Sequence, residues 1–338
     1  MSENGQYVPG SLWFYAPNKG APVFFAVAFC ASTVWQLWQT YHNKCWRMTG
    51  VLVFAGTLFT AGFITREIAA FDYGNLVKLI VSVCLVYAAP PLFELANYQI
   101  LGRILYYVPH LSPIHPGRVL TTFAFISSVV EALNGNGASY STNQSLPKSK
   151  QDIGKALLKA ALLIQIVVVV LFLALTVTFH RRVHAAKIRS PKLTGVLRTL
   201  YASSALIAVR TIYRIVEYFS LAELHFGPGL NPDAFGPEVR YEWFFYVFEA
   251  TLMLCNASLW NVRHPRKYLP KSTKVYLARD GVTEVVGPGY KDTRSFWVTL
   301  VDPFDLKGML GKKNGRGTTE FWNEVQGGTN IDSERTCQ

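Results

Sequence analysis

The sequence predicts an all-α polytopic membrane protein, a bundle of seven transmembrane helices, and three observations support this fold class. Hydrophobic residues make up 50% of the 338-residue chain and charged residues only 16%, against roughly 25% charged in a soluble domain. Seven apolar stretches approach or exceed the length of about 20 residues that a helix needs to cross a bilayer. Basic residues are dense in alternate loops between these stretches, as the positive-inside rule requires.

The first and second spans are expected over residues 21–41 and 50–70. Residues 1–20 are rich in Gly, Pro and aromatic residues. No basic segment precedes the first apolar run, so we expect no cleavable signal peptide. The second span carries Arg66 and Glu67 near its end. We interpret both as candidate ligand-binding residues, because charge is expensive within a membrane span.

The third span is expected over residues 76–101 and contains Pro90 and Pro91. A proline inside a helix removes a backbone donor and clashes with the preceding turn, so we predict a kink. The kink is expected to turn Glu94 and Asn97, which follow the prolines, toward the bundle interior.

The fourth span is expected over residues 119–134, which makes it the shortest, and its only acid is Glu131. We predict that it ends in a loop, because the sequence NGNGASYSTNQS follows. The fifth span, over residues 160–179, is the purest apolar run in the chain, and Gln165 is its only strongly polar side chain.

The sixth and seventh spans contain VRTIYRIVEYFS (209–220) and EWFFYVFEATLMLCNASLW (242–260). At about 100° per residue, the charged residues of the sixth span fall within an arc of roughly 60°, and the polar residues of the seventh drift by only about 40°. These stripes consist of Arg210, Arg214 and Glu217 in the sixth span and Glu242, Glu249 and Asn256 in the seventh.

Such stripes are expected to face a partner or a wet cavity, because a charge at the bilayer centre costs about 2.5 to 3.5 kcal/mol on insertion scales. We predict that Arg210 pairs with Glu249 near the bilayer midplane, at the floor of an outward-facing polar cavity. Arg214 is expected to be neutralised by Glu217 or by Glu242.

The distribution of basic residues predicts the orientation. Lys and Arg gather after the first, third and fifth spans and are absent after the second and sixth. The N-terminus is therefore expected outside and the C-terminus in the cytoplasm. The loop after the fourth span contains lysines, but it also contains the glycosylation sequence Asn143-Gln144-Ser145. We therefore predict that this loop is exoplasmic and that Asn143 is a glycosylation acceptor.

The predicted organisation has three parts: an exoplasmic segment over 1–20, a transmembrane domain over 21–262, and a largely flexible cytoplasmic tail over 263–338. The tail begins with the polybasic sequence RHPRKYLPKSTK (263–274). Such a segment next to the last helix suits anionic cytoplasmic lipids. Topological anchoring alone is the alternative interpretation.

Several classes of function find no support in the sequence. The net charge of +12 is carried beside apolar spans and in the tail, so membrane topology explains it better than nucleic-acid binding does. The glycines of NGNGAS follow no strand and precede no Lys-Ser/Thr, so they form no phosphate cradle. The pair His180 and His184 has no third ligand nearby. We therefore expect no enzyme activity, cofactor, metal site or disulfide framework.

Four sequence runs carry a resemblance to a known family. The pattern Arg-x-x-Tyr-Arg-x-x-Glu is met by Arg210, Tyr213, Arg214 and Glu217. The other runs are GFITRE (62–67), YAAPPLFELANYQILGRI (87–104) and EWFFYVFEATLML (242–254), with His264-Pro265 after the last. On these runs the region from about 13 to 270 resembles the fungal RTA-like lipid-translocating exporter family.

The resemblance implies a fungal seven-helix membrane protein with its N-terminus outside, expected in the plasma membrane. Members of the family are linked to the movement of sphingoid long-chain bases, to porphyrin traffic and to resistance against toxic amphipaths. The end of the fourth span departs from the family pattern. Ser127 is retained, but Ala124 and Glu131 occupy the positions of an acid and an amide. The substrate of this chain is therefore expected to differ from that of its relatives.

Two classes of function and one structural interpretation follow. The first function is a translocator in which the polar or cationic head of an amphipathic molecule enters the acidic stripe while its tail stays near membrane lipid. The second is a heptahelical sensor of a similar lipid ligand. Alternatively, the charges only lock helices together. The candidate binding residues are six acids and three arginines: Glu67, Glu94, Glu131, Glu217, Glu242, Glu249, Arg66, Arg210 and Arg214.

Overall fold

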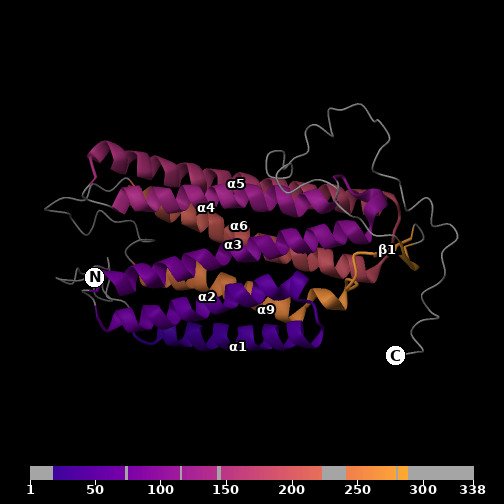
Figure 1. The fold of residues 1–338 in the computed structure, drawn as a ribbon, viewed down its shortest axis with the longest axis horizontal. Helices are drawn as coiled ribbons and strands as arrows, with labels where there is room; N and C mark the ends of the chain where they lie inside the picture. The colour runs from indigo at the N-terminus through magenta and orange to yellow at the C-terminus, as the bar shows by residue number, and fades with distance from the viewer. Residues whose placement is uncertain are drawn as a thin grey trace. The chain divides into compact units, whose positions relative to one another are not determined.

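The computed structural model describes residues 18–72, 75–114, 116–142, 146–222, 241–278 and 281–287 (Figure 1). It confirms an all-α polytopic membrane protein. Asn143, most of the predicted N-terminal segment and the tail beyond residue 287 lie outside the described residues. The orientation in the membrane stays a prediction.

The helices of the described chain match the predicted spans in number and order. Four of them, α1, α2, α3 and α5, are both long and apolar enough to cross a membrane by themselves. The helical segments are α1 (Ala21–His42), α2 (Trp46–Ala70), α3 (Leu76–Tyr107), α4 (Pro116–Thr142), α5 (Lys148–Ala185), α6 (Pro191–Ala222) and the composite of α8 (Glu242–Phe245), η3 (Tyr246–Thr251) and α9 (Leu252–Val262). Two short 3₁₀ turns are η1 (Pro109–Leu111) and η4 (Pro265–Lys267).

The chain divides into two compact units. The first unit comprises Met1–Ala96, Ser127–Val169 and Ala202–Val262, and the second comprises Asn97–Ile126, Val170–Tyr201 and Arg263–Gln338. Helices α3, α4, α5 and α6 contribute residues to both units. All nine candidate binding residues belong to the first unit.

Aromatic stacking forms the core of the first unit, where α1 packs against α2 and α9. The rings of Phe29 and Phe59 stack with centroids 4.5 Å apart. Phe63 stacks on Phe29 at 5.6 Å, and Phe93 lies 6.2 Å from Phe59. Phe29, Phe59 and Phe63 are fully buried, so the periodic apolar faces of α1 and α2 meet each other.

A glycine allows α1 and α2 to approach closely. A β-carbon added at Gly56 would lie 2.2 Å from Oγ1 of Thr33. That hydroxyl donates a hydrogen bond of 2.6 Å to the carbonyl of Phe29. Small residues at such contacts are common in membrane helices, because dispersion between closely packed backbones replaces the hydrophobic driving force that lipid removes.

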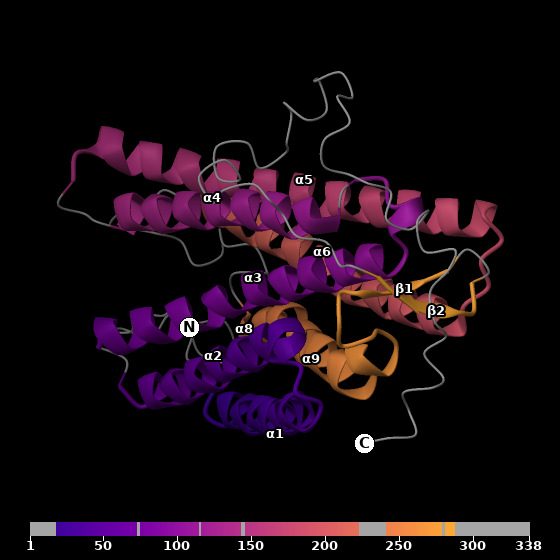
Figure 2. The ribbon, with the colours of Figure 1, turned by 45° about the vertical axis from the view of Figure 1, so that its right-hand side comes forward.

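The prediction for the end of the fourth span was wrong. Helix α4 continues through Asn134-Gly135-Asn136-Gly137 to Thr142, and α5 begins at Lys148. A β-carbon on Gly137 would lie 2.8 Å from Leu158, and one on Gly154 would lie 2.6 Å from the nitrogen of Ser141. These glycines therefore serve close packing of α4 on α5, which run side by side in Figures 1 and 2. Tertiary contact outweighs their low helix propensity of about 1 kcal/mol each.

Helix α3 continues through Pro90 and Pro91. Glu94 and Asn97, which follow the prolines, are only 3% and 2% exposed. The predicted burial of these two side chains is therefore confirmed.

The second unit contains a small hairpin that the sequence did not predict. Strand β1 (Val275–Leu277) pairs antiparallel with β2 (Glu284–Val286). The carboxylate of Glu284 accepts hydrogen bonds from Tyr107 Oη at 3.0 Å and from Lys192 Nζ at 2.9 Å. These two hydrogen bonds hold the first part of the tail to the last residue of α3 and to the first turn of α6.

We expect Gly56→Ala to lower the thermal midpoint of the detergent-solubilised protein, because the new methyl group collides with Thr33. Overpacking of this kind typically costs about 1 to 3 kcal/mol. The double variant Gly56→Ala with Thr33→Ala should recover most of the loss. Gly50→Ala is the control, since its β-carbon would meet Trp46 at an ordinary 3.4 Å. Equal losses for Gly50→Ala and Gly56→Ala would contradict this packing.

We expect acid to destabilise the wild-type protein through His264. This side chain is 2% exposed and its Nδ1 accepts a hydrogen bond of 3.2 Å from the backbone N–H of Arg266. Burial, with the charges of Lys267 and Arg266, lowers the pKa of His264 to about 4. Below pH 6.5 the unfolded chain therefore binds more protons than the folded one, and stability falls as the pH drops toward 4.

The variant His264→Asn keeps an acceptor for Arg266 but cannot be protonated. The wild type should lose up to about 3 kcal/mol more than this variant between pH 7 and pH 4, at 1.36 kcal/mol per pKa unit. Thermal denaturation across this pH range measures the difference. Parallel curves for the two proteins would show that His264 does not control the acid response.

Candidate functional site

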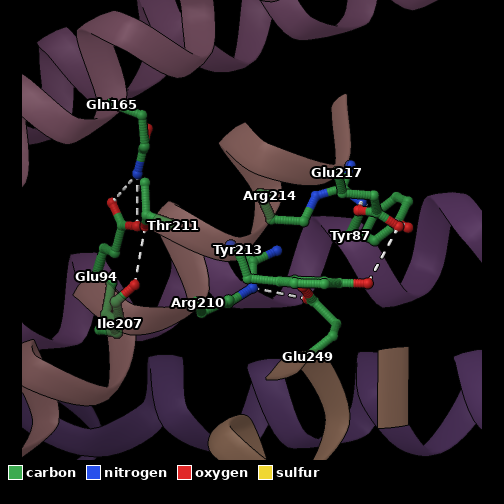
Figure 3. Close-up of polar contacts among 10 residues, drawn as sticks. All are labelled: Tyr87, Glu94, Gln165, Ile207, Arg210, Thr211, Tyr213, Arg214, Glu217 and Glu249. Carbon is green, nitrogen blue, oxygen red and sulfur yellow. Dashed lines mark hydrogen bonds and ion pairs between the residues drawn. The ribbon is translucent and has the colours of Figure 1, made fainter. Parts of the chain in front are cut away.

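The centre of the charged cluster is a buried ion pair between α6 and η3 (Figure 3). Nε of Arg210 donates to Oε1 of Glu249 at 2.7 Å. Glu249 is 0% exposed and Arg210 is 9% exposed. The predicted pairing is confirmed. Within the described part of the chain, Oε2 of Glu249 is buried and has no hydrogen-bond partner, so this carboxylate keeps an acceptor for a water molecule or a ligand.

Glu249 lies in a π-helical turn. Residues Tyr246–Thr251 form η3 between α8 and α9, and Oγ1 of Thr251 donates to the carbonyl of Tyr246 at 2.8 Å. A π-helical turn inserts one extra residue per turn and changes the direction in which following side chains point. Such turns occur frequently at functional sites. The sequence stripe of Glu242, Glu249 and Asn256 assumed a regular α-helix and could not show this.

A second pair lies about one turn farther along α6. Nη1 of Arg214 donates to Oε2 of Glu217 and, at 2.8 Å, to the hydroxyl of Tyr87. The guanidinium also lies over the Tyr87 ring, 4.0 Å from its centroid. The hydroxyl of Tyr213 donates to Oε1 of Glu217 at 3.4 Å. Of the two partners predicted for Arg214, the structure selects Glu217.

Glu242 has a different partner from the one that the sequence suggested. Its carboxylate accepts a hydrogen bond of 2.7 Å from Nη2 of Arg66 and one of 3.1 Å from the hydroxyl of Tyr246. It also accepts the backbone N–H of Asn18 at 2.7 Å. The guanidinium of Arg66 lies 4.3 Å from the centroid of the Phe245 ring. Arg66 and Glu242 therefore connect α2 to the start of α8.

Glu94 is held by an amide from another span. Nε2 of Gln165 donates to both carboxylate oxygens of Glu94 at 2.5 Å (Figure 3). Glu94 comes from α3 and Gln165 from α5. The isolated polar residue in the most apolar span thus has a defined partner.

The remaining two candidate acids lie outside these pairs. Glu67 accepts the backbone N–H of Gly20 at 3.4 Å and so helps to hold the start of α1. Glu131 is exposed on α4, yet it lies close enough to Arg210 for an electrostatic interaction.

Exposure rises along the cluster. The side chain of Glu249 is 0% exposed and that of Arg210 is 10% exposed, whereas those of Glu217 and Arg214 reach 14% and 21%. The cluster thus runs from a buried pair between α6 and η3 to a less buried pair nearer the end of α6.

Sequence reasoning missed two members of the cluster, Tyr87 and Gln165. Gln165 gave a signal, because a single strongly polar side chain in an apolar span must find a partner. Tyr87 gave none, since tyrosine is common at membrane interfaces. In the described residues no group of His, Cys, Asp or Glu could hold a metal ion. The predicted glycosylation site, Asn143, lies outside them.

The helices and the buried ion pairs between them define a polytopic, all-α membrane protein that carries paired charges in its helical bundle. The family described as RTA1 like protein matches residues 52–272, more than half of the chain. The chain therefore belongs to this family, as the resemblance indicated. No solved structure gives a significant match.

Relatives in three fungi carry names that describe transport. The chain is 42% identical to a lipid-translocating exporter-like protein RTA1 of Leptosphaeria maculans, over 83% of this chain and 56% of the relative. It therefore spans little more than half the length of that relative. It is 25% identical to a probable lipid transporter, atnI, of Emericella nidulans, over 79% of this chain and 71% of the relative. It is 27% identical to protoporphyrin uptake protein 1 of Saccharomyces cerevisiae, over 72% and 88% of the two chains.

We expect Arg210→Ala and Glu249→Ala to be severely damaging individually. Each substitution leaves an uncompensated buried charge, which typically costs about 3 to 5 kcal/mol. Membrane abundance and thermal stability in detergent measure the loss. The double variant Arg210→Glu with Glu249→Arg should fold better than either swap alone. The control is Asp72→Ala, which breaks an exposed ion pair with Lys78 and should cost at most about 1 kcal/mol. Wild-type abundance of both single alanine variants would contradict a structural role for the pair.

Proposed function

We propose that this protein moves an amphipathic, lipid-like molecule across a membrane, with the polar head of the molecule passing along the charged cluster and its tail remaining near lipid. The chemical class is a sphingoid base, a sterol-like molecule or a toxic amphipath. The rise in exposure from Glu249 to Arg214 carries the proposal. The transport-related names of the relatives support it.

A cationic head group fits the charge of the cluster. The candidate residues contain six acids but only three arginines, and each arginine already has one acidic partner. The acidic residues without an arginine partner can therefore bind an ammonium group. Its transfer from water is costly unless it meets such a counter-charge.

The second pair suggests how a head group enters. Arg214 contacts Glu217, but Tyr87 also accepts its Nη1 hydrogen bond and offers a ring face to the guanidinium. When an incoming ammonium takes over Glu217, Arg214 keeps its tyrosine partner. The exchange therefore leaves Arg214 with a hydrogen bond and a ring contact, which lower the cost of separating it from Glu217.

The deeper pair offers the next acceptor. The buried Oε2 of Glu249, which lacks a partner among the described residues, can receive a hydrogen bond from the head group after it leaves Glu217. The protein has no recognisable nucleotide-binding motif in its sequence, so we propose facilitative or ion-coupled movement. In the cell, this movement at the plasma membrane would confer resistance to toxic amphipaths.

A transport assay tests this proposal. Proteoliposomes of phosphatidylcholine containing the purified chain should exchange a fluorescent sphingoid base between leaflets faster than empty liposomes do, as followed by quenching of the outer leaflet. Glu217→Gln keeps the shape of the side chain but removes its charge. It should slow the exchange about tenfold, equivalent to about 1.4 kcal/mol in the barrier.

The matched control is Asp72→Asn, which removes an acid from an exposed pair outside the cluster and should leave the rate unchanged. Saturable binding of the fluorescent base without any exchange by the wild type would overturn transport and favour a sensor. Equal exchange rates for Glu217→Gln and the wild type would show that the charged cluster does not form the transport pathway.

A further inference from the structure

The second unit contains a cavity of about 500 Å³, a volume within the range of roughly 300 to 1,000 Å³ that is typical of small-molecule sites. The end of α5, the loop to α6 and the first turns of α6 form its walls, together with Arg263. None of its lining residues belongs to the charged cluster described above. Arg263 is the first residue of the polybasic segment 263–274, and the other lining residues come from α5, α6 and the loop between them.

The lining of the cavity is strongly basic. Arg189, Arg198 and Arg263 contribute three guanidinium groups, and His180 and His184 contribute two imidazoles. No Asp or Glu lines the cavity. In the described parts of the chain, none of the three arginines forms an ion pair with an acid. All three arginines are exposed, and like charges that line one space repel one another, so a bound anion would find a favourable potential there.

The start of α6 adds to this positive field. Pro191, the first residue of the helix, has no N–H, and the N–H of Thr194 donates to the carbonyl of Ser190 at 3.0 Å. Lys192 and Leu193 supply the other first-turn N–H groups, and Leu193 lines the cavity. The first N–H groups of a helix have no intrahelical acceptor, and the macrodipole is positive at this end. Phosphate groups bind readily in such a place.

The lining of the cavity also contains apolar side chains. Val183, Ile188 and Leu197 line it, and the apolar run of α5 ends at Phe179, immediately before His180. The cavity therefore lies where hydrocarbon is expected to give way to water. A lining that combines apolar and basic side chains suits the boundary between the acyl chains and the head group of a phospholipid.

The hairpin helps to fix the walls. Gly281, with φ of +76°, lies so close to Ile188 that an added β-carbon would approach it to 3.0 Å. Lys192 is engaged by Glu284 of the same hairpin. Lys192 is thus paired with an acid, whereas the three exposed arginines that line the cavity are the cations there without an ion pair among the described residues.

We propose that this cavity is a phosphate-binding site that receives the phosphate of an anionic phospholipid or of a soluble phosphate compound. The planar guanidinium fork matches phosphate oxygens bidentately, so arginine is the residue best suited to such a group. The site is separate from the proposed transport cluster in its residues and in the sign of its charge. A bound phospholipid would link α5, α6 and the residue that follows α9.

The test uses the full chain in phosphatidylcholine nanodiscs, titrated with dioctanoyl phosphatidic acid and, separately, with inorganic phosphate. Thermal stability and tryptophan fluorescence report binding. The wild type should show saturable binding of at least one probe. The triple variant Arg189→Gln, Arg198→Gln and Arg263→Gln should bind at least about thirtyfold more weakly, because it loses several charge-assisted hydrogen bonds. Binding of phosphatidic acid alone indicates a lipid source, whereas equal binding of both probes indicates a soluble one.

A matched triple variant controls for net charge. Arg47→Gln, Arg181→Gln and Lys187→Gln remove the same charge from exposed residues that do not line the cavity, and binding should stay within about threefold of the wild type. The single variant Arg198→Gln gives the same test if the lining triple does not fold. Equal weakening of binding in both triple variants would show that probes are attracted by net charge alone and would overturn the site. Unchanged binding in the lining triple variant or in Arg198→Gln would also overturn it.

Discussion

The cost of placing charge in a low-dielectric interior governs the structure of the first unit. Arg210 and Glu249 are both buried, and each is tolerated because the other lies 2.7 Å away. The attraction between two such ions offsets the loss of hydration only when the geometry is close and further polar contacts are made. The pair therefore fixes the rotation of α6 against η3, and neighbouring side chains must fit around it.

Two other charges of the cluster have more than one partner. Arg214 contacts Glu217 and Tyr87, and Glu242 accepts from Arg66 and Tyr246. With a second polar partner, each of these side chains keeps a hydrogen bond when one contact is exchanged, which a transport role requires and a packing lock does not. This physical property connects the observed geometry to the proposed passage of a polar head group.

The candidate binding residues and the basic cavity carry charge of opposite sign. In the first unit, acids outnumber arginines among the candidate residues, and the geometry suits a cation. In the second, three arginines and two histidines line one cavity without an acid, and the geometry suits an anion. A net charge of +12 describes neither environment, because the function of a charge depends on its neighbours rather than on the total.

The sequence by itself determined the spans, because hydropathy is a local property, and it placed Arg210 and Glu249 on inward faces, because helical periodicity is regular. Tertiary structure decided what depends on two elements at once. Glu242 pairs with Arg66 because an ion pair depends on how each helix is rotated about its axis and on how far along the helix each residue lies. Helix α4 continues through Gly137 because α5 packs closely against it. The π-helical turn, the tyrosine beside Arg214 and the basic cavity likewise required contacts between segments that are distant in the chain.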